Sequence, residues 1–316
     1  METHLGVTAA LAPLVLFVYQ RPSHTKKVLD AIANDLLAKK TVLYVYSDGP
    51  KQPEDSIELE KIAQTRALIK NFKGCKEVHL YSKTKNEGLA RSIVGGVTDI
   101  VEKYGKVIVL EDDILISPFF LTYMNQALDL YEKEDRVMHV GSFVPQRSGQ
   151  EKLPGTYFLR FMNCWGWATW QRAWQKLELD TPLLLDKLQD REDKTFFDLE
   201  NSIGVLKQLK DNINGKINTW AVKWYTSIFL HNGLCLYPKR SLTSQIGLDG
   251  SGIHADVDMD NWYQVSMSAS INVQKISVAE NTVAYQYLKQ FYRYGNFKGW
   301  KAVKRYLRFH QQRLKF

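Results

Sequence analysis

The chain has 316 residues, of which 45% are hydrophobic and 24% are charged, as in a globular protein with one large α/β domain or two modest ones. No apolar run reaches the roughly 20 residues that a membrane-spanning helix needs. The longest candidate, residues 7–19, is interrupted by Pro13 and lacks the basic leader and cleavage site of a signal peptide. The cysteines Cys75, Cys164 and Cys235 have no metal-type spacing. They argue for a reducing, cytoplasmic compartment and against a disulfide framework or a zinc site.

The net charge of +8 is concentrated at one end of the chain. After Glu280 there are nine basic residues and no acidic one, so the rest of the chain has a net charge of −1. A nucleic-acid-binding protein would carry its positive charge on the folded body, so we expect no nucleic-acid partner. Four apolar residues recur within the basic tail: Trp300, Val303, Leu307 and Leu314. An amphipathic helix of this kind lies on anionic membrane surfaces, and a helix packed on the domain is the alternative.

Apolar runs alternate with helical patterns over the first 140 residues. Strands are predicted at 13–19, 41–49, 77–82, 106–110 and 137–142, and helices from Ser23, over 54–72, over 86–104 and over 118–134. Ser23 and Asn86 are the predicted helix N-caps, and Gly105 is the predicted helix stop. Alternation of this kind predicts a parallel sheet covered by helices on both sides.

Polar residues follow three of the predicted strands, at 20–24, 47–49 and 111–113. Because ligands of parallel sheets gather at the carboxyl ends of the strands, we expect these residues to converge on one rim. The triplet at 111–113 is Glu-Asp-Asp. Adjacent carboxylates there can hold Mg²⁺ or Mn²⁺, whereas a single Asp would be explained as a helix cap. No phosphate-cradling GxxxxGK[ST] or GxGxxG loop accompanies them, which weakens an NTPase or dinucleotide-binding interpretation.

The second half of the chain concentrates aromatic residues and glycines at 163–174, and it continues into a glycine loop at 247–254. Trp170 and Trp174 are four residues apart on a predicted helix, and this spacing places both in the core. No linker, internal repeat or low-complexity tract separates the two halves. One domain with an elaborated second half is therefore expected.

The segment 106–143, KVIVLEDDILISPFFLTYMNQALDLYEKEDRVMHVGSF, resembles the region around the metal-binding acidic triplet of GT-A glycosyltransferases. It is most similar to the N-acetylglucosaminyltransferase I family, and the similarity extends in order over about residues 12–254. The block WAVKWYTSIFLHNGLCLYPKRSLTSQIGLDGSGIH also resembles bacterial sugar transferases of the same fold.

The resemblance implies an α/β fold of the GT-A type, with a Rossmann-like, mostly parallel sheet flanked by helices and a basic C-terminal helical tail. Residues 1–280 would form the glycosyltransferase domain, with a nucleotide-binding half at about 12–142 and an acceptor half at about 143–260. Residues 281–316 would form the basic amphipathic tail.

The resemblance also implies roles for individual residues at the rim. Arg21 matches a position near the nucleotide, and Asp48 matches the acid that recognises the uracil edge. Asp113 matches the metal ligand, while Glu111 and Asp112 match positions toward the ribose and sugar of the donor. A surface salt bridge for Arg21 and a turn for Asp48 are the alternatives.

Further residues are expected around these. Arg91 is expected to bind the donor, and His254 is expected to touch the diphosphate or ligate the metal, with a solvent-facing histidine as the alternative. Trp165, beside the flexible Gly166, is expected near the acceptor, because an aromatic face suits the C–H face of a pyranose.

The sequence departs from the family at the catalytic base. The animal family uses an Asp in a W-D-D-W stretch, whereas the corresponding TWAVKW offers only Ala221, Val222 and Lys223. Inverting transfer needs a base within hydrogen-bond reach of the acceptor hydroxyl. Asp249 in the glycine loop is the predicted substitute, and a turn residue beside Gly250 is the alternative.

The expected activity is therefore that of an inverting glycosyltransferase, dependent on Mn²⁺ or Mg²⁺. It would move a sugar from a nucleotide-sugar donor, expected to be a UDP-sugar, to a glycan or lipid-linked acceptor in bacterial surface polysaccharide synthesis. The tail would hold the enzyme peripherally at the inner membrane face. The alternatives are a sugar-nucleotide nucleotidyltransferase, which usually has a glycine-rich loop after the first strand, and a non-catalytic carbohydrate-binding protein.

Overall fold

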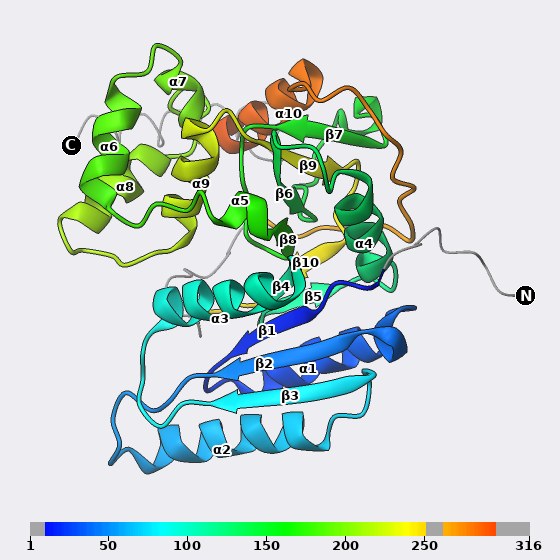
Figure 1. Ribbon diagram of the computed structural model, residues 1–316, viewed down its shortest axis with the longest axis vertical. Helices are drawn as coiled ribbons and strands as arrows, with labels where there is room; N and C mark the ends of the chain where they lie inside the picture. The colour runs from blue at the N-terminus through cyan, green and yellow to red at the C-terminus, as the bar shows by residue number, and fades with distance from the viewer. Residues whose placement is uncertain (1–9, 251–261, 295–316) are drawn as a thin grey trace, which may run out of the picture.

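The computed structural model describes residues 10–250 and 262–294, which fold around one eight-stranded sheet of strand order β3-β2-β1-β4-β8-β6-β9-β7 (Figure 1). The strands of this sheet are β1 (Leu14–Val18), β2 (Val42–Ser47), β3 (Glu77–Ser82), β4 (Lys106–Glu111), β6 (Val137–Gly141), β7 (Thr156–Leu159), β8 (Trp167–Trp170) and β9 (Leu234–Pro238). A separate two-stranded ribbon pairs β5 (Ile114–Ile116) with β10 (Thr243–Gln245).

Ten α-helices are assigned within these described residues. They are α1 (Pro22–Ala33), α2 (Ser56–Asn71), α3 (Leu89–Tyr104), α4 (Phe120–Leu130), α5 (Gln171–Trp174), α6 (Thr181–Gln189), α7 (Lys194–Phe197), α8 (Val205–Ile213), α9 (Ala221–Leu230) and α10 (Thr282–Tyr294). The prediction of an α/β fold with helices flanking a mostly parallel sheet is confirmed.

The sheet changes direction in its middle. Strands β3, β2, β1 and β4 are parallel, as the sequence predicted. Next to them, β8 runs antiparallel both to β4 and to β6, and β6 then pairs in parallel with β9. The predicted strand at 137–142 therefore forms, but in the second half of the sheet and across β8 from β4.

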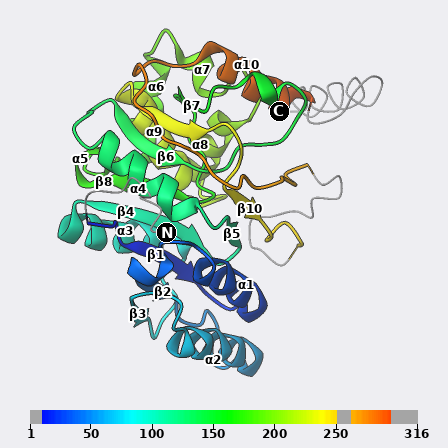
Figure 2. The same ribbon diagram turned by 90° about the vertical axis from the view of Figure 1, so that its right-hand side faces the viewer.

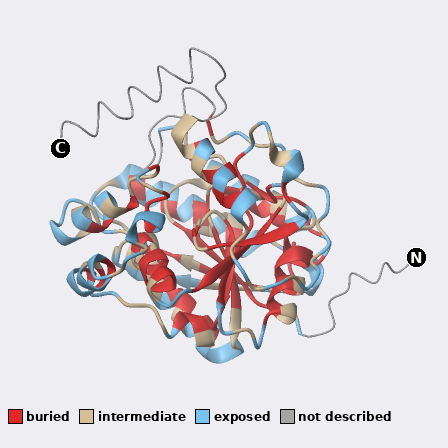
Figure 3. Cartoon of the chain, turned by 90° about the horizontal axis from the view of Figure 1, so that it is seen from above, coloured by how far each residue is buried: buried red, intermediate tan, exposed pale blue. Residues whose placement is uncertain are grey.

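The helices form two layers with separate apolar cores. On one face, α1, α2 and α4 pack against the sheet, and on the other face lie α3, α5, α6, α8, α9 and α10. Figure 2 shows α1 and α3 on opposite sides of β1. Most strands are buried in the middle of the molecule, while exposed residues lie mainly on the outer helices, the loops and the edge strand β3 (Figure 3). Burial on both faces explains why β1 and β4 read as uninterrupted apolar runs.

Two of the three predicted helix ends differ from the structure. Helix α1 begins at Pro22 with Arg21 as its N-cap, because proline has the backbone angle of a first helical residue. Gly88 caps α3, while the Asn86 amide donates to the Gly49 carbonyl instead. Gly105 ends α3 in a left-handed conformation, φ +75°, which confirms the predicted stop.

The tryptophan prediction is right about burial and wrong about the element. Trp170 and Trp174 are 2% and 4% exposed. Trp170, however, closes strand β8 and Trp174 ends the short helix α5, so the two do not share one helix. The four-residue spacing arises here from a strand-to-helix turn.

Helix α10 covers the first part of the predicted tail and buries Ala284, Leu288 and Phe291. The apolar residues on which the membrane prediction rests, Trp300 to Leu314, lie outside the described residues. No helix within the described ranges is both long and apolar enough to cross a bilayer.

Candidate active site

The acidic triplet lies where β4 ends, and it faces Arg21, which lies three residues after the end of β1. Since β1 and β4 are parallel neighbours, Arg21 and the triplet reach the same edge of the sheet. The Arg21 Nη1 donates to Asp113 Oδ2 at 2.9 Å and to Asp112 Oδ1 at 3.3 Å. All three side chains are only 10–16% exposed. The predicted convergence of residues 20–24 and 111–113 is present in the structure.

The charges at this rim are not balanced. Burial, and then the neighbouring carboxylates of Asp113 and Asp112, raise the pKa of Glu111 above its usual range. The same causes, burial and then Asp113, raise the pKa of Asp112 to about 7. The pKa of Arg21 is lowered by its burial but raised overall by Asp112 and Asp113. One guanidinium thus faces three carboxylates, and a fully ionised cluster would have a net charge of −2.

Arg21 also has unused donors. Its Nε and Nη2 atoms are buried, and neither has a hydrogen-bond partner among the described residues. A buried, unpaired guanidinium nitrogen is costly, and anionic ligands such as phosphate suit its fork of donors. The Arg21 side chain is therefore arranged to accept an anion beside the acids.

The β5–β10 ribbon brings the loop after β10 onto the acidic triplet. The Ile246 amide donates to the Asp113 carbonyl at 2.9 Å. Gly247 packs so closely that a Cβ there would lie 2.2 Å from Asp113 Oδ2 and 2.6 Å from Arg21 Nη2. A larger residue at position 247 would therefore have to displace the Asp113 and Arg21 side chains, so Gly247 lets the loop lie closely over the ion pair.

Two residues farther along, Asp249 pairs with a residue of α1. The Asp249 Oδ2 lies 3.0 Å from His24 Nε2, and the side chains are 47% and 11% exposed. Asp249 is also close enough to help raise the pKa of Arg21. The predicted base therefore lies at the same rim as the acids, with an imidazole that fixes its orientation.

Asp48 lies at the carboxyl end of β2 and holds a loop in place. Its Oδ1 accepts from the amides of Gly49 and Glu87, and its Oδ2 accepts from the amide of Gly88, each at 2.9 Å. A Cβ on Gly49 would lie 2.5–2.6 Å from the Lys85 backbone, so the two loops are in close contact. The Asp48 carboxylate is therefore part of the structural framework of the rim.

Sequence reasoning missed the arginine that fastens this corner. Arg66 on α2 donates to Ser47 Oγ at 3.0 Å, to the Asp48 carbonyl at 3.0 Å and to the Lys83 carbonyl at 2.7 Å. It thus ties the ends of β2 and β3 together. The sequence shows only that Arg66 belongs to a strongly charged helical segment. A solvent-exposed arginine would fit that pattern equally well.

The loop before β8 brings the predicted acceptor residues to the triplet. Because β8 is antiparallel to β4, with Trp167 paired to Val109, the residues preceding Trp167 lie beside the end of β4. Burial, and then the charges of Glu111 and Asp113, raise the pKa of the Cys164 thiol in this loop.

Within that loop, Trp165 has aromatic neighbours. Its ring centroid lies 4.6 Å from Phe143 and 5.0 Å from Tyr263, both edge to face. Gly166 has φ +80°, and a Cβ would lie 2.7 Å from Thr243 Cγ2. Gly166 is required by this left-handed, tightly packed turn, which differs from the flexibility that the sequence suggested.

Two predicted residues have no contact with the acidic triplet among the described residues. Arg91 is exposed on the first turn of α3. His254 lies outside the described residues. No group of three or more His, Cys, Asp or Glu side chains with metal-binding geometry occurs in the ranges 10–250 and 262–294.

No protein-family model matches the chain, and no curated protein is significantly similar to it. Several solved structures are similar in fold. A mannosyltransferase from Pyrobaculum calidifontis, in complex with GDP-Man and Mn²⁺, is 11% identical, with 71% of each chain covered and a TM-score of 0.38. The galactosyltransferase LgtC, in complex with donor and acceptor sugar analogues, is 8% identical over 92% of this chain and 99% of its own, with a TM-score of 0.38. A UDP-glucose pyrophosphorylase is 12% identical over 72% and 90%, with a TM-score of 0.34. At these scores, the chemistry of the rim is argued from the residues of this chain alone.

Proposed function

We propose that the protein is a metal-dependent glycosyltransferase that uses a nucleotide-sugar donor, with UDP as the expected nucleotide. The observation that carries this proposal is the buried cluster of Arg21 with Glu111, Asp112 and Asp113 at the carboxyl ends of β1 and β4. In this cluster, the Arg21 guanidinium has hydrogen-bond donors without a partner among the described residues, and the carboxylates outnumber it. A diphosphate bound together with a divalent cation satisfies both needs.

The carboxylate oxygens at the rim suit a hard divalent cation as ligands. The carboxylate oxygens of Asp113 and Asp112 are ligands of the type that Mn²⁺ and Mg²⁺ accept. Burial and mutual repulsion already disfavour ionisation of Glu111 and Asp112, and a cation would relieve that repulsion. Asp113 is proposed as the principal ligand, with His254 as a further one. When bound, the ion would neutralise negative charge on the diphosphate leaving group.

The remaining roles fall to side chains at the same rim. The free Nε and Nη2 donors of Arg21 would bind the diphosphate, and the loop held by Asp48 would form the wall toward the nucleotide base. Arg91 is proposed to contact the nucleotide-sugar donor. Asp249 is proposed as the general base that accepts the proton of the acceptor hydroxyl, and His24 would hold its carboxylate in position. Such a base on the acceptor side corresponds to an inverting transfer.

The acceptor is proposed to be a glycan or lipid-linked saccharide. Trp165, with Phe143 and Tyr263 around it, gives an aromatic wall beside the acids, and Gly166 brings the backbone close. We further propose a role in bacterial surface polysaccharide synthesis, in the cytoplasm and at the inner membrane face, where the basic tail would contact anionic lipids. Deleting the residues after 294 and measuring binding to anionic liposomes tests the last point, because unchanged binding would reject it.

The experiment is a donor panel with the full chain. Hydrolysis or transfer is measured with UDP-, GDP- and dTDP-sugars, with and without Mn²⁺, and nucleotide binding is measured by calorimetry. Metal-dependent turnover with one class of donor is expected. Release of the nucleoside diphosphate without added pyrophosphate separates this activity from that of a nucleotidyltransferase, which needs pyrophosphate to convert a nucleotide-sugar into a nucleoside triphosphate and a sugar 1-phosphate. Absence of turnover and of nucleotide binding for every donor would refute the proposal.

A further inference from the structure

Strand β3 (Glu77–Ser82) is the outermost strand of the sheet on the donor side, and among the described residues it pairs only with β2. The Lys83 amide donates to the Ser47 carbonyl at 2.9 Å. Because backbone groups alternate in direction along a strand, those of Val78, Leu80 and Ser82 then face away from β2. The edge therefore presents three residues with outward N–H and C=O groups.

This edge lacks the features that usually block pairing. Its register with β2 is continuous from Glu77 to Ser82, with no bulge, and the strand contains no proline. Charged side chains, Glu77 and Lys83, stand only at its ends. Proteins normally interrupt an exposed edge by such devices, because a regular edge is a template for another strand.

One face of the edge carries a row of stacked rings. Tyr46 stacks on Tyr81 at 5.1 Å, and Tyr44 stacks on His79 at 4.8 Å, with interplanar angles of 21° and 17°. Tyr81 is 46% exposed, and the His79 side chain is 43% exposed. The row begins at Phe17 in the core and ends at the edge strand, so the outermost rings lack an aromatic neighbour beyond them among the described residues.

We infer that β3 pairs with β3 of a second copy of this chain, antiparallel and about a two-fold axis at Leu80. This register pairs all three outward residues, because Leu80 then forms a hydrogen-bonded pair with Leu80 of the second copy, and Val78 with Ser82. In the non-hydrogen-bonded positions, where side chains are closest, His79 meets Tyr81 and Glu77 meets Lys83. The ring row is self-complementary in this register, and Glu77 and Lys83, which pair with His79 and Glu87 of their own chain at 3.3 Å each, would gain a second partner of opposite charge.

The helix beneath the edge has a matching polarity. Helix α2 packs on β3, and it carries the exposed Glu60 in its first half and the exposed Lys70 in its second half. An antiparallel copy would place the acidic half of one helix toward the basic half of the other.

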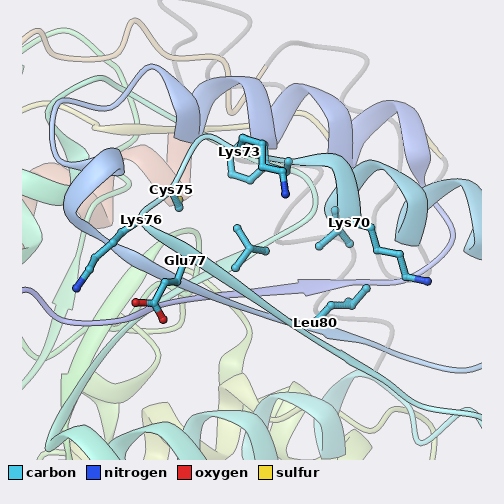
Figure 4. A pocket seen from close by; sticks show the side chains of 9 residues that line it. Lys70, Lys73, Cys75, Lys76, Glu77 and Leu80 are labelled. Carbon is cyan, nitrogen blue, oxygen red and sulfur yellow. The ribbon is translucent and has the colours of Figure 1, made fainter.

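A pocket of about 410 Å³ opens between the end of α2 and β3, with Ile69, Phe72, Val78 and Leu80 among its lining residues (Figure 4). It lies on the face of the strand opposite the rings, because Val78 and Leu80 pack with the α1 and α2 core. Lys70, Lys73, Lys76 and Glu77 also line the pocket, so this face of the strand offers both apolar and polar contacts to the second copy. This inference is independent of the proposed function.

Sedimentation velocity and light scattering on the full chain at 1–100 µM give the first test. We expect a dimer of twice the 36.5 kDa chain mass; a monomer throughout this range would overturn the inference.

The register is tested with Leu80→Cys. A hydrogen-bonded pair has Cα atoms about 5.5 Å apart, within the range of a disulfide, so mild oxidation should link two chains. Val78→Cys is the matched control, since its two copies would lie more than about 13 Å apart. Wild type under the same oxidant controls for the native cysteines. A dimer in which Leu80→Cys links no better than Val78→Cys would refute the register and the inference.

A charge exchange tests the pairing without touching the core. Lys83→Glu should weaken the dimer roughly tenfold, because two like-charged pairs replace two attractive ones. Adding Glu77→Lys should restore it to within about threefold of wild type. Equal dissociation constants for wild type and Lys83→Glu, or no recovery in the double variant, would count against the proposed arrangement.

Discussion

Asp113→Asn should separate function from stability at the rim. The change removes one negative charge from a cluster in which Arg21 faces three carboxylates, and keeps the shape of the side chain. It weakens a 2.9 Å charged hydrogen bond, which costs about 1.5–3 kcal/mol. It also removes a carboxylate that raises the pKa values of both Glu111 and Asp112. One pKa unit corresponds to about 1.4 kcal/mol, so the two effects largely cancel.

We therefore expect the free energy of unfolding to change by no more than about 1 kcal/mol, measured by urea denaturation at pH 7.5. Binding of Mn²⁺ with UDP, measured by calorimetry, should weaken at least about 100-fold, because a principal ligand is lost. The matched control is Asp129→Asn, whose pair with Lys106 is 2.8 Å long and similarly buried. That variant should lose about 1–2 kcal/mol of stability and keep nucleotide binding.

Equal effects of Asp113→Asn and Asp129→Asn on stability and on binding of Mn²⁺ with UDP would contradict a ligand role for Asp113. Asp113→Asn that binds Mn²⁺ and UDP within threefold of wild type, while losing about 3 kcal/mol of stability, would make the acids a structural cluster.

Three further changes have expected outcomes. Asp48→Ala removes the acceptor of three backbone amides and should cost about 2–4 kcal/mol in urea denaturation; a loss below 0.5 kcal/mol would mean that water replaces the carboxylate. Gly166→Ala forces a side chain into a left-handed turn 2.7 Å from Thr243, and the melting temperature should fall by several degrees; an unchanged value would contradict the close packing. Burial raises the pKa of Asp35 from 3.8 to about 6. The stability linked to this raised pKa is fully present below pH 3.8 and lost as the pH rises through 6, by about 3 kcal/mol in total. Asp35→Asn should remove this component when urea midpoints are compared between pH 4 and pH 7.5, and an identical pH profile would refute it.

Strands β1, β2 and β4 were predictable because each is a mostly buried parallel strand and reads as a short apolar run. The rim followed from the same reasoning, since parallel neighbours end at one edge. That placed Arg21 and Asp113 together from sequence alone, and the structure confirms their proximity. Local signals of this kind need no knowledge of distant contacts.

The second half was less predictable because its strands are short and because the residues that they bring into contact are distant in sequence. Strand β8 has four residues, and β5 and β10 have three each, too few to establish a periodicity. The ribbon of β5 and β10 is nevertheless what brings Gly247 onto Asp113. His24 beside Asp249 was missed for the same reason, since the two residues meet only after the ribbon has formed.

The reversal of direction at β8 has an evolutionary consequence. The loops that the proposed function assigns to the nucleotide leave the ends of β1, β2 and β4, whereas the loop that carries Trp165 approaches the acids from the opposite direction, ahead of β8. The two sets of loops belong to separate stretches of chain and meet at the rim without sharing a strand. If the proposed function holds, mutations in the loop before β8 can therefore change contacts to the acceptor while the strands that position Arg21 and Asp113 stay constant, so a lineage with this architecture could diversify its acceptors while conserving its donor.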